Sequence, residues 1–144
     1  MKRIVLMYFF LIGIQTSMIA GDDQAIQVDQ LPKKARELIN THFRDVKISF
    51  AKMDKEIFDT SYDVIFTNGD KIEFDRKGNW TNIKCRAGIP NAIIPARIRE
   101  YIQEHHPNQK VIDIDYDNRE YEVKLVNGIE MKFDKKYRMK GYDD

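Results

Sequence analysis

A segment with the pattern of a helix is followed by several strand-like segments, and the chain carries this combination twice. In each copy, mainly apolar residues recur at steps of three and four positions after a proline, which is typical of one face of a helix with proline in its first turn. The two sets are Ala35, Leu38, Ile39, His42 and Phe43 after Pro32, and Ile98, Tyr101, Ile102 and His105 after Pro95. A chain built this way must pack two helices against strands.

Residues of alternating polarity follow each helical segment, and a period of two indicates a strand with one buried face. Asn68-Gly69 and Asn127-Gly128 suit a type I′ hairpin turn, in which both residues need positive φ. We also expect a last strand from Trp80 to Cys85 in the first copy and from Tyr137 to Tyr142 in the second. The alternating sets are Val46, Ile48 and Phe50, then Phe58, Thr60, Tyr62, Val64 and Phe66, then Ile72 and Phe74, and in the second copy Tyr121, Val123 and Leu125, then Ile129, Met131 and Phe133.

These patterns predict an α+β protein made of two tandem helix-plus-four-strand repeats. The first repeat is expected at residues 31–86, a connector at 87–91 and the second repeat at 92–144. Neither repeat alone buries much apolar surface, so we expect both to share one antiparallel sheet of about eight strands. Both helices would pack on one face of that sheet and leave the other face open to solvent. A structure in which the chain buries both faces would contradict this prediction.

The first twenty residues have the order of a secretory signal. Lys2 and Arg3 precede an apolar run from Ile4 to Ile14, and small and polar residues lead to Ala20. We therefore expect a cleaved leader at 1–20, a polar spacer at 21–30, and a periplasmic or secreted protein. The alternative is an uncleaved anchor, which the length of the run disfavours because a spanning helix needs about 20 apolar residues. No stable membrane anchor is expected after cleavage.

The balance of charges narrows the classes of partner. Loss of Lys2 and Arg3 with the leader changes the formal net charge from +1 to −1. Interspersed charges of both signs do not form the one-sided basic field that attracts nucleic acid or an anionic bilayer, so neither is expected as a partner. Cys85 is the only cysteine. The fold must therefore be stable without an intrachain disulfide, and Cys85 is either buried or paired with another chain.

The motifs resemble those of the PepSY-like, beta-lactamase-inhibitor-like family of exported bacterial proteins. The resemblance rests on Leu-Pro before an amphipathic helix, a Tyr-x-Val strand, Asn-Gly and then Ile-Glu-Phe-Asp, and it extends from about Leu31 to Tyr142. It implies the fold of the beta-lactamase inhibitory protein, in which two helix-and-four-strand repeats form a concave sheet that grips an enzyme. It brings no catalytic residues and no cofactor, and it implies a protein as the partner. The chain lacks that inhibitor's disulfides, so a beta-lactamase partner is not implied.

Aromatic residues near the last strands are candidate protein-binding residues, because Trp and Tyr often anchor interfaces. The candidates are Trp80, Tyr137, Met139 and Tyr142, and the alternative for Trp80 is a place in the core or at the rim of the sheet.

Three alternating carboxylates, Asp113, Asp115 and Asp117, are weak candidates for a metal site. An EF-hand loop needs Gly at its sixth position and Glu at its twelfth, where this chain has Asn118 and Lys124. The solvated face of a strand is the simpler interpretation, so no metal and no cofactor is expected. His42 and His105 occupy equivalent places near helix ends and suit packing and capping better than metal binding.

Together these features predict a non-enzymatic protein-binding or inhibitor-like module of the bacterial envelope that uses an open sheet face. Its partner would be an unidentified envelope or extracellular protein. No Ser-His-Asp, HExxH or glycine-rich phosphate motif is present, so no catalytic residue is assigned. Two alternatives stay open, a small-ligand carrier, which would need an enclosed pocket, and an envelope hydrolase, which would need a convergent nucleophile and base.

Overall fold

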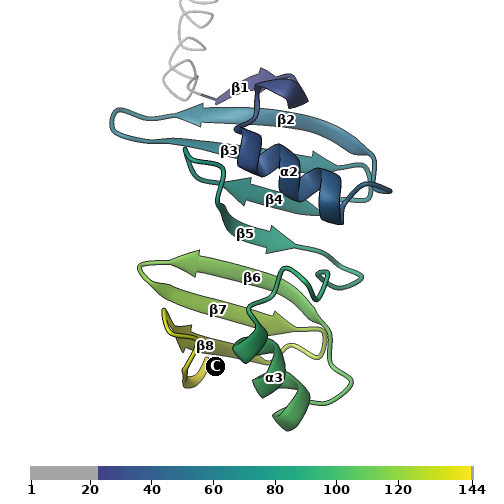
Figure 1. Cartoon of the computed structure of the whole chain (residues 1–144), viewed down its shortest axis with the longest axis vertical. Helices are drawn as coiled ribbons and strands as arrows, with labels where there is room; N and C mark the ends of the chain where they lie inside the picture. The colour runs from purple at the N-terminus through teal and green to yellow at the C-terminus, as the bar shows by residue number, and fades with distance from the viewer. Residues whose placement is uncertain (1–22, 144) are drawn as a thin grey trace, which may run out of the picture.

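The computed structural model describes residues 23–143, in which two α-helices pack against one nine-stranded sheet (Figure 1). In chain order the elements are β1 (Asp23–Ile26), the 3₁₀ turn η2 (Val28–Gln30), α2 (Lys33–His42), β2 (Ile48–Lys55), β3 (Thr60–Phe66), β4 (Lys71–Phe74), β5 (Trp80–Lys84), α3 (Ala96–His105), β6 (Val111–Asp117), β7 (Glu120–Leu125), β8 (Glu130–Asp134) and β9 (Met139–Asp143). The protein is therefore α+β, as its sequence predicts.

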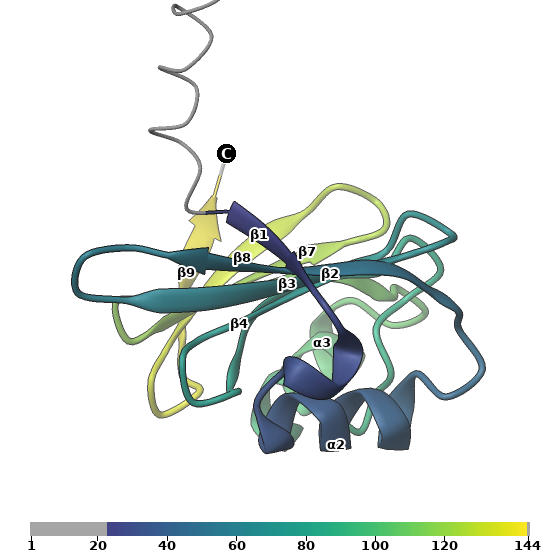
Figure 2. The same cartoon turned by 90° about the horizontal axis from the view of Figure 1, so that it is seen from above.

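The sheet is an antiparallel meander in which every strand pairs with the next one along the chain, from β1 to β9. Figure 2 shows α2 and α3 on the same side of this sheet. The prediction that both helices cover one face is therefore confirmed for the described residues. We call the opposite side the open face.

Each helix begins after a proline, Pro32 for α2 and Pro95 for α3, where a missing N–H leaves no backbone bond unmade. The helices bury the face that the sequence pattern indicates. Their buried residues are Ala35 and Ile39 in α2 and Ile98 and Ile102 in α3. The two apolar stripes lie over the sheet and leave the charged sides of the helices in solvent.

The strands align so that apolar side chains form a continuous row across the helix-covered face. Side chains alternate between faces along a strand, so one register row faces the helices and the next faces solvent. The apolar row consists of Ala51, Val64, Ile72, Ile83, Ile114, Val123, Met131 and Tyr142, each opposite the next on the neighbouring strand. All of these except Tyr142 at the sheet edge are buried, and they form the floor of the core.

The predicted burial of Phe50 and Phe58 is wrong. A bulge in β2 between Ile48 and Phe50 reverses the alternation, so Phe50 faces away from the helices and is 49% exposed. Phe58 lies beyond the end of β2, beside Ile57 at the tip of the β2–β3 hairpin. The exposed fractions of Ile57 and Phe58 are 90% and 95%. An alternating pattern of hydrophobic residues does not reveal where a bulge adds an extra residue or where a strand ends.

The turn type predicted at the two Asn-Gly pairs is also wrong, although both hairpins form. Gly69 and Gly128 have φ of 93° and 95°, but neither Asn68 nor Asn127 is among the residues with positive φ. The amide of Gly69 donates to the carbonyl of Phe66 at 2.9 Å. This is a three-residue hairpin loop with its glycine in the left-handed conformation. Like the two-residue type I′ turn, it favours Gly at that position.

The segment predicted as a polar spacer contains structure. Within residues 21–30, Asp23–Ile26 forms β1 and pairs with β2, and Val28–Gln30 forms one 3₁₀ turn. Edge pairing depends on backbone hydrogen bonds, so it needs no apolar pattern in the sequence. The predicted leader at 1–20 lies outside the described residues. None of the helices between residues 23 and 143 is long and apolar enough to cross a membrane.

Candidate functional site

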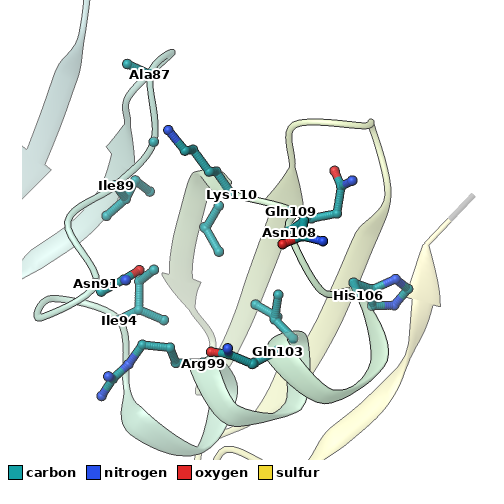
Figure 3. A pocket seen from close by; sticks show the side chains of 13 residues that line it. Ala87, Ile89, Asn91, Ile94, Arg99, Gln103, His106, Asn108, Gln109 and Lys110 are labelled. Carbon is teal, nitrogen blue, oxygen red and sulfur yellow. The ribbon is translucent and has the colours of Figure 1, made fainter.

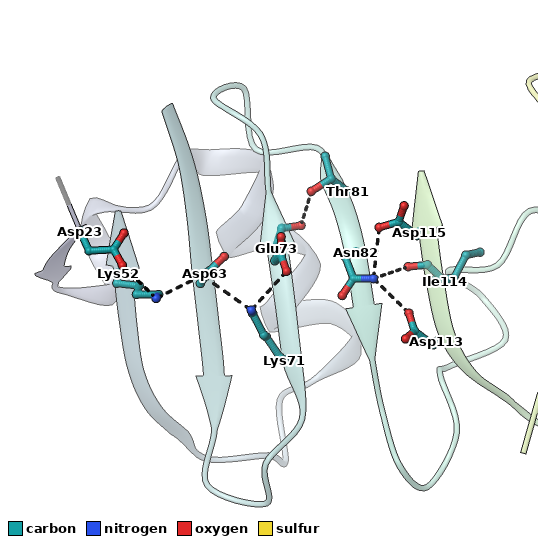
Figure 4. A network of polar contacts seen from close by, with 10 residues as sticks. All are labelled: Asp23, Lys52, Asp63, Lys71, Glu73, Thr81, Asn82, Asp113, Ile114 and Asp115. Carbon is teal, nitrogen blue, oxygen red and sulfur yellow. Dashed lines mark hydrogen bonds and ion pairs between the residues drawn. The ribbon is translucent and has the colours of Figure 1, made fainter. Parts of the chain in front are cut away.

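The open face carries a row of polar side chains across the sheet, in the register next to the apolar row. Figure 4 shows the part of this face that runs from β1 to β6. The row consists of Lys52, Asp63, Glu73, Asn82, Asp115, Glu122, Lys132 and Gly141, each opposite the next on the neighbouring strand. Because α2 and α3 lie on the other side of the sheet, the helices leave this row uncovered.

The part of the row on β1 to β4 is a chain of ion pairs (Figure 4). Lys52 Nζ lies 3.2 Å from Asp23 and 3.6 Å from Asp63, and Lys71 Nζ lies 3.8 Å from Asp63 and 3.2 Å from Glu73. Asp63 thus has two lysines beside it, although its side chain is only 15% exposed. Burial raises the pKa of Asp63, and the two lysines act against that rise. The pKa of Lys52 is raised chiefly by its hydrogen bond to Asp23.

The part on β5 and β6 is built around Asn82, which is 7% exposed and the one buried polar residue of the described chain. Its Nδ2 donates to Asp113 Oδ1 at 3.0 Å, to Ile114 O at 3.3 Å and to Asp115 Oδ1 at 3.3 Å. Its Oδ1 has no hydrogen-bond partner in the described structure. Burial raises the pKa of Asp115; the bond from Asn82 opposes this and the nearby carboxylates add to it.

A hollow of about 260 Å³ opens beside this group. Its lining residues are Asn82, Lys84, Asp113, Asp115, Glu122, Val123, Lys124 and Glu130. Four of these carry carboxylates and two carry ammonium groups, so the lining is acidic on balance. Of the three aspartates that the sequence singles out, Asp113 and Asp115 meet at Asn82, whereas Asp117 is exposed at the end of β6. Across residues 23–143, no three His, Cys, Asp or Glu side chains gather closely enough to hold a metal ion by themselves.

The four candidate aromatic and methionine residues lie on the helix side of the sheet, away from the open face. Trp80, Tyr137 and Met139 pack against the core. The ring of Trp80 lies 6.2 Å from that of Tyr121, which lies 5.4 Å from that of Tyr137. For Trp80 the structure therefore fits the alternative interpretation, in which the side chain packs against the core at the rim of the sheet.

Tyr142 is exposed at the edge strand β9 and contacts α3. Its Oη lies 2.9 Å from His106 Nε2 and 3.3 Å from Tyr101 Oη. His105 stacks on Tyr101 with ring centres 4.0 Å apart. These contacts tie the last strand to the end of α3. The candidate residues and the open face are therefore two separate surfaces.

The hollow of about 560 Å³ beside α3 is the candidate for a small ligand (Figure 3). Arg99 and Lys110 line it, and its lining contains no acidic side chain. In Figure 3, Arg99 and His106 lie on opposite sides of the hollow, so its polar groups do not converge on one point. Within residues 23–143, the histidine hydrogen bonds go to Tyr101 O and Tyr142 Oη rather than to a serine, threonine or cysteine.

Two features, the buried Asn82 and the exposed pair Ile57 and Phe58, were not identified from the sequence. Asn82 is flanked by Thr81 and Ile83 and reads as one more polar strand residue, because its burial depends on strands far along the chain. The alternating pattern assigns Phe58 to a strand, yet Phe58 lies with Ile57 in a turn closed by backbone hydrogen bonds between Glu56 and Asp59, with N to O distances of 2.7 and 3.3 Å. The polar residues around this pair are the signal that could have indicated a turn.

The chain is similar to a known protein family and to solved structures. The family model described as "Putative beta-lactamase-inhibitor-like, PepSY-like" matches residues 60–140. A protein from Bacteroides vulgatus ATCC 8482, provisionally described as a periplasmic member of the DUF2874 family, is 48% identical with a TM-score of 0.83. The match covers 87% of this chain and 99% of that one. No curated protein sequence matches the chain.

Two further solved structures are similar. One, from Bacteroides thetaiotaomicron, is provisionally described as a calcium-regulated periplasmic protein; it is 47% identical with a TM-score of 0.83, over 87% of this chain and 99% of that one. The other, from Bacteroides vulgatus ATCC 8482, is provisionally described as a periplasmic protein of unknown function. It is 34% identical with a TM-score of 0.79, over 85% of this chain and 99% of that one.

Proposed function

Because the chain belongs to the PepSY-like family, we propose that it is a non-enzymatic protein-binding or inhibitor-like module of the bacterial envelope. It works in the periplasm or is secreted, in line with its predicted leader and with its periplasmic relatives. The observation that carries the proposal is the one-sided sheet. Two helices cover one face, and the other presents a polar row to solvent.

The order of elements supports an inhibitor-like design. Each of α2 and α3 is followed by four antiparallel strands. We interpret this as two tandem repeats that share a sheet, as in the beta-lactamase inhibitory protein. Such a sheet offers one broad surface, which suits a protein partner better than a small molecule.

The open face also carries an apolar contact point at its β2–β3 end. Phe50 stands opposite Ile65 across the two strands and is half exposed. An aromatic side chain among charged neighbours is the usual form of an interface anchor with a polar rim. Phe50 therefore replaces Trp80 as the first residue to test on the proposed contact surface.

A capture experiment with two sets of variants tests the proposal. The purified protein is immobilised and exposed to envelope extract of the source bacterium, and bound proteins are identified and quantified. We expect Phe50→Ala and Glu122→Lys, both on the open face, to reduce the captured partner about tenfold or more. Tyr142→Ala, on the exposed helix side, is the matched control and should capture it as wild type does. Circular dichroism verifies that each variant is folded.

The opposite result would contradict the proposal. If Tyr142→Ala loses the partner and both open-face variants keep it, the contact lies on the helix side. A partner captured equally by all variants would likewise exclude the open face as the contact surface.

A small-ligand carrier is the second candidate, favoured by the basic hollow beside α3. Arg99 and Lys110 would suit an anionic ligand there. This candidate has less support, since the polar groups are spread around the hollow instead of converging (Figure 3).

A further inference from the structure

The tip of the β2–β3 hairpin carries the most exposed large apolar side chains of the described chain, Ile57 and Phe58. Strands β2 and β3 stay paired as far as Lys55 and Thr60, whereas β4 pairs with β3 only from Tyr62 onward. The hairpin therefore projects past β4, as Figure 1 shows. Two large apolar side chains in water are unfavourable, so the tip gains free energy when another surface covers it.

Carboxylates flank this apolar pair. Glu56 precedes it and Asp59 follows it, both are exposed, and neither forms an ion pair within residues 23–143. From Asp54 to Asp59 the chain has three acidic residues against one basic residue, Lys55, which gives this stretch a net charge of −2. An acidic tip is repelled by an anionic bilayer and attracted to a surface that carries cations.

The hollow beside α3 combines an apolar floor with cations (Figure 3). Its lining includes the buried core residues Ile89, Ile94 and Ile102. Arg99 and Lys110 also line it and are exposed, and neither has an ion-pair partner in the part of the chain that the structure describes. Its volume of about 560 Å³ is in the range of pockets that enclose a whole small molecule, so two side chains fit.

The spacing of the two cations suits a hairpin tip better than one small anion. In Figure 3, Arg99 and Lys110 lie apart, with Ile94 between them. The tip has the matching order, with a carboxylate on each side of an apolar pair. Both halves of this match occur on the same chain, so charge complementarity favours a second copy of the chain as the occupant of the hollow.

Within one molecule the tip cannot reach the hollow. In Figure 1 the tip lies at the upper left, whereas the segment 86–95 and α3, which line the hollow, lie to the right and below. A contact between them therefore joins two molecules. Because the two surfaces differ, the contact is head-to-tail, and repetition of it builds chains or closed rings.

We propose that the hairpin tip of one molecule inserts Ile57 and Phe58 into the α3 hollow of a second copy. The flanking carboxylates, Glu56 and Asp59, then meet the cations of the hollow. The contact leaves the open face uncovered, so self-association and the proposed capture of a partner are separate properties that can fail independently.

Sedimentation velocity of the purified protein over a range of concentrations tests the proposal. We expect the average mass to rise above that of the monomer with a dissociation constant on the order of 10⁻⁴ M, since the contact is smaller than a standard interface. Phe58→Ser, at an exposed site, should leave the fold intact and weaken association about tenfold or more. Phe50→Ser is the matched control, an exposed phenylalanine on the open face, and should associate as wild type does.

An exchange of charges separates direct contact from a change of fold. The tip variant Glu56→Lys with Asp59→Lys and the hollow variant Arg99→Glu with Lys110→Glu should each stay monomeric, because like charges then face each other. An equimolar mixture of the two should associate again, since each tip now finds a hollow of opposite charge. Circular dichroism verifies that both variants are folded.

The proposal is overturned if wild type stays monomeric up to about 1 mM, tenfold above the expected dissociation constant. It is also overturned if Phe50→Ser weakens association as much as Phe58→Ser does, or if the mixture of charge variants stays monomeric. Binding of wild type but not Phe58→Ser to phosphatidylcholine vesicles, with no self-association, would assign the tip to a bilayer instead.

Discussion

At the scale of single residues, burial decides what Cys85 can do. The thiol is buried and free, next to the acidic Asp70. Burial, and to a smaller extent Asp70, raises the pKa of Cys85 to about 12. Since the thiolate is the reactive form, the folded protein holds this cysteine inert. Of the two alternatives left by the sequence, the buried thiol is the one that the structure shows.

Cys85 is therefore expected to resist thiol reagents until the chain unfolds. In the folded protein at pH 8, reaction with a disulfide reagent such as DTNB should be at least about a hundredfold slower than in guanidinium chloride. A half-time of minutes for the folded protein would contradict this. A folded pKa above the unfolded value also means that the neutral thiol stabilises the fold fully below about pH 9. That contribution should be lost as pH rises toward 12. Cys85→Ala should lack this part of the pH dependence.

The position of Asn82 beside Asp113 and Asp115 could not be predicted from the sequence. The sequence identifies Asp113 and Asp115 as a pair on one strand face, and the structure places them side by side. The partner that joins them comes from β5, about thirty residues earlier, and only the register of β5 against β6 brings it there. Local patterns cannot supply that register.

At the scale of elements, the β4–β5 turn lies so close to α2 that it leaves no space for a side chain at Gly78. Gly78 lies in the β4–β5 turn with φ of 88°, and a Cβ added there would lie 2.9 Å from Pro32 Cβ and 3.0 Å from the Ala35 amide nitrogen. Gly128, in the β7–β8 turn, has φ of 95° and nothing within 4 Å of such a Cβ. The two glycines share a positive φ and differ in what surrounds them.

This pair of glycines separates backbone strain from steric contact. Gly128→Ala should cost about 1–2 kcal/mol in free energy of unfolding, from the left-handed backbone alone. Gly78→Ala should cost a further amount of about 1–3 kcal/mol, because the added methyl group pushes α2 away from the turn. Urea denaturation of both variants measures the difference. Equal costs would mean that α2 moves aside without penalty.

The elements themselves were largely predictable, and their irregularities were not. Apolar spacing identified both helices, and alternation with Asn-Gly pairs identified the hairpins, because these signals are local. The bulge in β2 turns the side chain of Phe50 to the open face, and β1 forms by backbone pairing at the edge of the sheet. Neither feature changes the pattern of hydrophobic residues in the sequence.

At the scale of the whole molecule, one junction joins the strands that follow α2 to those that follow α3. Strands β5 and β6 share three residue pairs, fewer than any other neighbouring strands in the described sheet. Yet the apolar row crosses this junction without a gap, through Ile83 and Ile114, both fully buried. We therefore expect the sheet to unfold as one unit and not as two halves.

Two probes of unfolding test this cooperativity. Trp80, the only tryptophan, lies on β5 beside Tyr121 of β7, so its fluorescence reports on the junction between the halves, and far-ultraviolet circular dichroism reports on the whole chain. Their urea transitions should coincide, and Ile83→Ala should lower the free energy of unfolding by about 2–5 kcal/mol for both probes. Separate transitions would show two independent units joined side by side.

The sequential strand order has a consequence for how the protein is made. Each strand from β2 onward pairs with the one synthesised just before it. A chain that leaves a ribosome or a secretion channel with its N-terminus first can therefore add strands one at a time to an edge that already exists. No strand has to wait for a distant segment to emerge, which shortens the time that a bare edge is exposed to other chains.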